Sequence, residues 1–170
     1  MDKTTLWFEI YQLPQGCANS ANYYGLEEWT EFFTDGHLYE IMPRENAGNP
    51  LPIGVFYFDS QCMLRDRLLS LQHADPHEAH GDRRPASGLM INTANADAID
   101  AAPSYVVIRT LQNGESFVYK AGPYLDRVVK AAARWRGAKR RVGYDTLRGA
   151  PETPTAPIAA PMMVTAPTPP

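Results

Sequence analysis

Residues 51–72, LPIGVFYFDSQCMLRDRLLSLQ, carry the clearest secondary-structure signal in the chain. Their first half is a short apolar run rich in β-branched and aromatic side chains, which is typical of a strand covered on both faces. We therefore expect residues 52–59 to form a strand in the middle of a sheet. Asp59 or Ser60 then caps a helix that Pro76 stops. The buried stripe of that helix is expected to consist of Leu64, Leu68 and Leu71.

Other strands are predicted on both sides of this stretch. An aromatic-rich segment near the N-terminus ends at Pro14, which favours a first strand there. Asn113 and Gly114 separate two alternating runs, and Asn-Gly in that setting is the strongest short-range signal for a hairpin with a type I′ turn. Cys17 falls in a segment with the composition of a polar loop. The expected strands are residues 4–13, 37–42, 88–92, 105–111 and 116–120.

Two further helices are predicted. Residues 26–33 place apolar and acidic side chains at helical spacing, so they predict a short amphipathic helix. Gly122 and Pro123 open a longer one, because Pro at the first helical position loses no hydrogen bond. Apolar side chains and arginines then recur at helical spacing as far as Gly143. This segment therefore predicts a C-terminal helix with one apolar and one basic face.

Together these elements predict an α+β fold. We expect a single globular domain over residues 1–148, with a mixed or antiparallel sheet of about five strands and two main helices packed on it. The sheet would be centred on residues 52–59 and the hairpin at 105–120. Residues 149–170 are rich in Pro, Ala and Thr, cannot bury enough apolar surface to order themselves, and are expected to form a disordered tail.

Cysteine content and hydropathy indicate a compartment. Only Cys17 and Cys62 are present, too few for a disulfide scaffold in 170 residues, so we expect two reduced thiols. The N-terminus lacks the basic and long apolar regions of a secretory signal. No apolar run approaches the length of about 18 residues that indicates a membrane span. The expectation is a soluble cytoplasmic protein with no membrane partner.

Charge is distributed unevenly along the chain. Residues 1–119 hold 16 acidic and 7 basic side chains, whereas residues 120–148 hold 9 basic and 2 acidic ones. Clustered cations can neutralise phosphates. Our leading hypothesis is therefore a small non-enzymatic binding or regulatory protein that docks on nucleic acid or on an acidic protein surface. The alternative is a solvated face paired with the protein's own acids. The candidate docking residues are Arg127, Lys130, Arg134, Arg136, Lys139, Arg140 and Arg141.

A second hypothesis is a small hydrolase. His73, His77 and His80 lie four and three residues apart among carboxylates, which are ligand types for zinc, although Pro76 breaks the helix that this spacing needs. Cys62 falls in the first turn of a predicted helix, where the thiol pKa can be lowered and a histidine could act as its base.

The sequence contains no phosphate-binding loop, dinucleotide fingerprint or GxSxG motif, so we expect no cofactor. Neither the histidines nor Cys62 has a supporting motif, and no metal or catalytic residue is assigned. A third hypothesis takes the dense N-terminal aromatic residues and the tail as assembly contacts within a larger complex.

Overall fold

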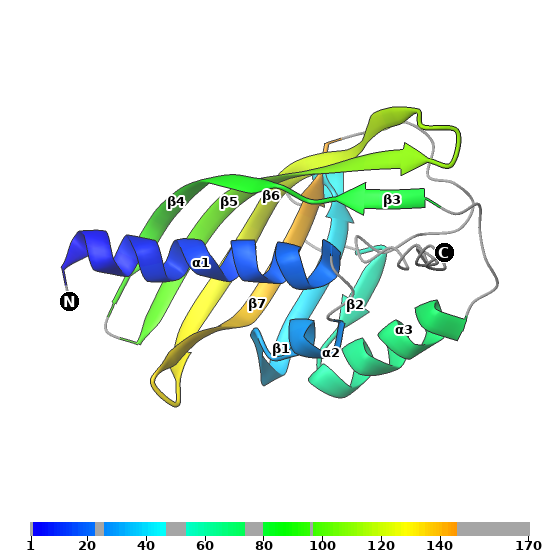
Figure 1. The fold of residues 1–170 in the computed structure, drawn as a ribbon. Coiled ribbons are helices and arrows are strands. Elements are labelled where there is room, and N and C mark those ends of the chain that lie inside the picture. The colour runs from blue at the N-terminus through cyan, green and yellow to red at the C-terminus, as the bar shows by residue number, and fades with distance from the viewer. Residues whose placement is uncertain (1, 23–25, 47–53, 74–79, 96, 146–170) are drawn as a thin grey trace, which may run out of the picture.

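The computed structural model describes residues 2–22, 26–46, 54–73, 80–95 and 97–145. Within these ranges seven strands form one mixed sheet in the order β2-β1-β7-β6-β5-β3, and β4 pairs with another part of β5 (Figure 1). Strands β1 and β7 run parallel, and the other pairings are antiparallel. The strands are β1 (Phe33–Pro43), β2 (Phe56–Phe58), β3 (His80–Arg83), β4 (Ala86–Ala94), β5 (Ala98–Leu111), β6 (Ser116–Ala131) and β7 (Arg134–Tyr144).

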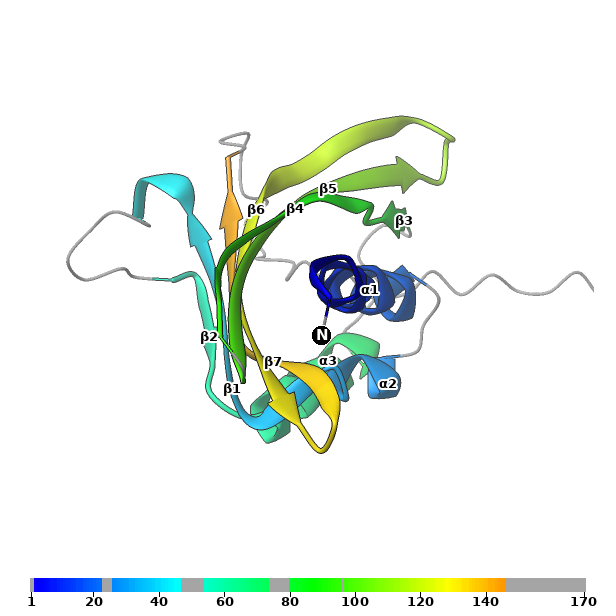
Figure 2. The same ribbon diagram turned by 90° about the vertical axis from the view of Figure 1, so that its left-hand side faces the viewer.

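The sheet curls around helix α1 (Lys3–Asn22), which lies along its concave face (Figure 2). The buried side chains of α1 are Ile10, Pro14, Cys17 and Ala21, spaced by 4, 3 and 4 residues as one face of a helix requires. Helices α2 (Leu26–Thr30) and α3 (Gln61–His73) lie beside β1 and β2, and a short 3₁₀ turn, η1 (Arg44–Asn46), follows β1.

Alternation along β5 shows how the sheet divides into two faces. Ile99, Tyr105 and Val107 are buried toward α1, whereas Ser104 and Ile108 point to the opposite side and are exposed. We call the side away from α1 the outer face of the sheet. The concave side holds the hydrophobic core, and the outer face has no second layer among the described residues.

Several local predictions are confirmed. Helix α3 begins just after Ser60, whose hydroxyl accepts a hydrogen bond from the Met63 amide at 3.4 Å, and Leu64 is buried. The 105–120 hairpin also forms, but its turn differs from type I′, because Gly114 alone in it has a positive φ, of 86°. The amide of Gly114 bonds to the carbonyl of Leu111 at 2.9 Å, as in a turn closed by a left-handed glycine.

The prediction of an N-terminal strand is wrong, because residues 4–13 lie within α1 and Pro14 is inside that helix. Aromatic content favoured a strand, but the 4-3-4 spacing of the buried positions decides for a helix. Cys17 accordingly lies in the core and not in a loop. The predicted helix at 26–33 is also shorter than expected, since α2 ends at Thr30 and β1 begins at Phe33.

The predicted C-terminal basic helix is also wrong. Residues 116–144 form the long antiparallel hairpin of β6 and β7. The buried positions of β6 are Tyr124, Asp126 and Val128, which alternate as in a strand. Because Asp126 is charged, this alternation does not stand out in the sequence. Gly122 opens no helix: a side chain there would collide with the backbone carbonyl of Gly143.

The strand expected at the middle of the sheet lies at its edge, because β2 pairs with β1 alone and comprises three residues. The sheet has seven strands where about five were expected, and the longest helix is α1. Residues 146–170 lie outside the described part of the chain, so the predicted tail stays a prediction.

Candidate functional site

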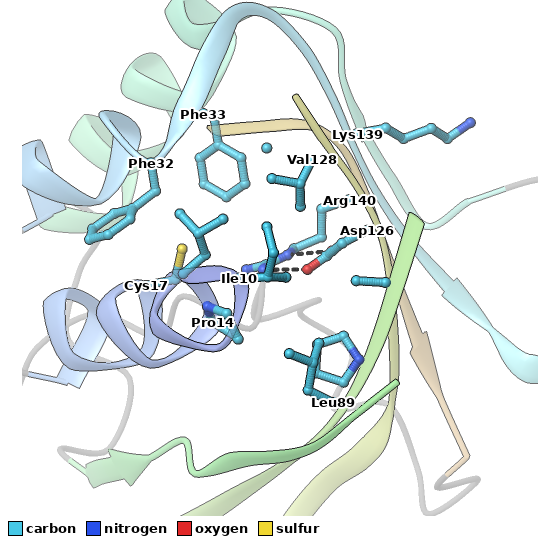
Figure 3. A pocket seen from close by; sticks show the side chains of 14 residues that line it. Ile10, Pro14, Cys17, Phe32, Phe33, Leu89, Asp126, Val128, Lys139 and Arg140 are labelled. Atoms are coloured by element: carbon cyan, nitrogen blue, oxygen red, sulfur yellow. Dashed lines mark hydrogen bonds and ion pairs between the residues drawn. The ribbon is translucent and has the colours of Figure 1, made fainter. Parts of the chain in front are cut away.

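The interior between α1 and the sheet is built around one buried ion pair. Arg140 on β7 and Asp126 on β6 are cross-strand neighbours, and each points toward α1 (Figure 3). The guanidinium donates two hydrogen bonds to the carboxylate, Nε to Oδ1 at 2.8 Å and Nη2 to Oδ2 at 2.7 Å. Both side chains are 6% exposed, and the guanidinium lies 4.5 Å from the centre of the Tyr124 ring. Burial disfavours the charge, but Asp126 holds the pKa of Arg140 well above its ordinary value.

Side chains fill the rest of this interior. Ile10, Pro14 and Cys17 of α1 meet Phe33, Val128 and Arg140 of the sheet, and the void left among them is about 10 Å³ (Figure 3). A second void, of about 20 Å³, is lined by Arg140 together with Tyr39 and Arg84. Each has room for about one water molecule.

Burial also keeps the thiol and the phenol groups of the interior neutral. It raises the pKa of the Cys17 thiol to about 11 and that of the Tyr124 hydroxyl to about 12. Tyr39 shows the same effect, with a pKa well above its ordinary value because of burial. These three groups therefore lack the near-neutral pKa that suits a general acid or base.

The seven basic residues predicted as a docking face are divided among three places. Arg140 is inside the protein. Lys139 and Arg141 lie on the outer face of β7, and both pair with Glu40 of β1, at 3.7 and 3.0 Å. Arg127, on the same face, pairs with Asp100 at 3.2 Å. Lys130, Arg134 and Arg136 lie near the tip of the β6–β7 hairpin.

The hairpin tip forms one wall of an open cleft of about 780 Å³. The other walls come from α1 and from α2 with the turn that follows it. Trp135 is 9% exposed, and its Nε1 donates to Glu9 Oε2 at 2.9 Å, which ties the hairpin to α1. The lining residues are Glu9, Gln12, Leu13, Gly16, Glu28, Glu31, Phe32, Ala133, Arg134, Trp135 and Arg136.

The residues of the hydrolase hypothesis are not brought together. Cys62 is an exposed thiol on α3, and His80 opens β3. His77 and the side chain of His73 lie outside the described part of the structure. Within the described ranges no group of three or more His, Cys, Asp or Glu side chains is placed to hold a metal ion.

Sequence reasoning missed the acidic side of the cleft, because Glu28 and Glu31 were assigned to the polar face of the predicted helix at 26–33 and Glu9 was not singled out. It also missed the partner of Arg140. The one available signal was the alternation of Tyr124, Asp126 and Val128, which predicts a strand with one charged side chain facing inward.

Comparisons with known proteins give a consistent picture. No protein-family model matches the chain. The chain is 45% identical to the anthranilate 1,2-dioxygenase small subunit of Burkholderia cepacia over 142 residues, which cover 84% of this chain and 88% of that one. It is 30% identical to the subunit beta 1 of the terminal oxygenase component of a Comamonas terephthalate 1,2-dioxygenase, over 68% of this chain and 75% of that one.

Among solved structures, the chain resembles a protein of Novosphingobium aromaticivorans assigned as the beta subunit of an aromatic-ring-hydroxylating dioxygenase. The TM-score is 0.79 and the identity 34%, over 86% of this chain and 94% of that one. The class is thus that of single-domain α+β proteins with the NTF2-like fold of such beta subunits. Within this class, the chain belongs to the family of small (beta) subunits of aromatic ring-hydroxylating dioxygenases.

This membership corrects the functional hypotheses. The expectation of a nucleic-acid-binding regulatory protein, with nucleic acid or an acidic protein as partner, is wrong, since the relatives are oxygenase subunits. The hydrolase alternative is wrong for the same reason. The expected basic helix does not exist, and four of its seven cations pair with the protein's own carboxylates. As for the membrane, no helix of the described residues is long and apolar enough to span one.

Proposed function

We propose that this chain is a non-catalytic small subunit, that it assembles with the large (alpha) catalytic subunit of an aromatic ring-hydroxylating dioxygenase, and that the assembled enzyme oxidises an aromatic carboxylate. The observation that carries the non-catalytic role is the filled interior. Small-molecule sites usually occupy about 300–1,000 Å³. The voids around Arg140 are about 10 and 20 Å³, so an aromatic ring has no room around this ion pair, and the larger cleft of about 780 Å³ at the hairpin tip is open to solvent.

The outer face of the sheet supports a role as a subunit. An antiparallel sheet face that meets water normally carries polar side chains. Here Met90, Ile108, Val118 and Leu125 lie on that face and are 64, 37, 56 and 42% exposed. Apolar side chains gathered on one face are typical of surfaces that another protein covers.

The substrate class comes from the relatives. Anthranilate and terephthalate, which name the two related enzymes, are both benzene rings bearing carboxylate groups. Anthranilate is the first compound to test, because the relative with 45% identity is the small subunit of an anthranilate 1,2-dioxygenase.

Co-expression with the large subunit of an anthranilate 1,2-dioxygenase tests the proposal. A tag on this chain should retain the large subunit, and the two should elute together in size-exclusion chromatography. Supplied with electrons and oxygen, the complex should consume anthranilate, while the isolated chain consumes none. Separate elution at micromolar concentration would refute the assembly, and turnover by the isolated chain would refute the non-catalytic role.

A further inference from the structure

The cleft between α1, α2 and the β6–β7 hairpin has walls of opposite charge. Glu28, in α2, and Glu31, just after it, are exposed on one side. Arg134 and Arg136, at the start of β7, stand on the other. Within the part of the chain that the structure describes, none of these four side chains forms an ion pair. The two walls face the same space without neutralising each other.

This lack of pairing distinguishes the cleft from the rest of the basic segment. On the outer face, Arg127, Lys139 and Arg141 each have an acidic partner on a neighbouring strand. Cross-strand register supplies those partners, because opposite and diagonal positions of adjacent strands bring their side chains together. The arginines that line the cleft form no ion pair among the described residues, and their charges remain available to another molecule.

The floor of the cleft is apolar and held in place. Leu13 from α1 and Phe32 from the α2–β1 connection line it beside the indole of Trp135. The hydrogen bond from Trp135 to Glu9 joins the hairpin to α1, and the Gly137 amide donates to the carbonyl of Phe32 at 2.9 Å, which joins the hairpin to the connection after α2. Phe8 lies one turn before Gln12 on α1 and is 55% exposed, which extends the apolar surface beyond the cleft.

We propose that this cleft receives a segment of the large subunit. The segment presents a carboxylate to Arg134 and Arg136 and a cation to Glu28 and Glu31. Between these charges it places an apolar side chain against Leu13 and Phe32. The inference rests on the proposed function, because it names the surface by which this chain meets that subunit. A small ligand with one charge would be attracted by one wall and repelled by the other. A protein segment can place both charges and an apolar group along an open cleft.

Binding of the full chain to the purified large subunit provides the test, by surface plasmon resonance at several salt concentrations. Two charge-reversed double variants probe the two walls: R134E/R136E and E28K/E31K. Each should weaken binding at least tenfold, and the loss should shrink as salt screens the charges. K3E/R65E makes the same change in net charge as R134E/R136E at exposed positions that do not line the cleft, and it should bind within about twofold of the wild type. All the substituted side chains are at the surface, and circular dichroism with thermal melts checks that each variant is folded.

The outcomes separate this inference from the proposed function. If the wild-type chain does not bind the large subunit, both are refuted. If it binds and both cleft variants bind equally well, the cleft assignment is wrong and the subunit role stands. If the control weakens binding as much as the cleft variants do, net charge and not the cleft governs association, and the cleft assignment is again wrong. The neutral variant E28Q/E31Q should lose less affinity than E28K/E31K, because it removes attraction without adding repulsion.

Discussion

Replacing Arg140 with methionine (R140M) removes the guanidinium from the bidentate pair with Asp126. Both side chains are 6% exposed, so the carboxylate left behind loses its two hydrogen bonds at 2.8 and 2.7 Å and has little access to water. Breaking one side of a buried ion pair typically costs about 3–5 kcal/mol, because the remaining charge is uncompensated. With a urea slope of about 2 kcal/mol/M, the unfolding midpoint should fall by about 1.5–2.5 M.

Urea unfolding followed by circular dichroism measures this effect, and two further variants test the reasoning. The double variant D126L/R140M removes both charges and should recover most of the lost stability, since an apolar pair of similar volume is often at least as stable. R127M, on β6, breaks the pair with Asp100, whose side chains are 53 and 42% exposed, and should cost less than about 1 kcal/mol. A loss below about 1 kcal/mol for R140M, or a double variant no more stable than R140M, would refute the buried-charge argument.

Three other predictions follow from single features of the fold. Ala132 and Ala133 form the β6–β7 turn with φ of 47° and 65°, a conformation that strains alanine and suits Asn and Gly. The variant A132N/A133G should therefore raise the melting temperature by about 2–4 °C, and an unchanged melting temperature would show that the turn is not strained. Burial lowers the pKa of His37, so protonation of this side chain opposes folding. The free energy of unfolding should be at its full value above about pH 6.5 and should fall as the pH drops below it. In His37→Gln the free energy of unfolding should depend less on pH over the same range. In the native protein a thiol reagent at pH 8 should modify the exposed Cys62 but not the buried Cys17, whose pKa is about 11. Rapid reaction of both thiols would contradict the burial of Cys17.

The parts of the fold that were predicted correctly depend on short-range signals. The Ser60 cap and the leucine at position 64 predict α3, and Gly114 predicts the turn of the 105–120 hairpin, because both depend on residues a few positions apart. The parts that were missed depend on distant partners. An aspartate at position 126 looks solvated until β7 brings Arg140 opposite it, and then it is a core residue.

The candidate site could not be predicted for the same reason. Its walls come from residues 9–16, 28–32 and 133–136, and no spacing within any of these segments indicates the others. The sequence did identify a positively charged region at 120–148, and Arg134 and Arg136 belong to it. It did not show which of its cations are paired, because pairing depends on strand register and on the helices that face the hairpin.

By itself, the sequence determined the α+β class, the position of α3 and the 105–120 hairpin, and the uneven charge. Local hydrogen bonding and side-chain periodicity decide these properties within a few residues. Only the tertiary structure decided that α1 fills the curve of the sheet, that Arg140 is a core residue and that Arg134 and Arg136 line the same cleft as Glu28 and Glu31. The cost of burying a charge and the benefit of pairing it depend on groups far away in the chain, and only folding brings those groups together.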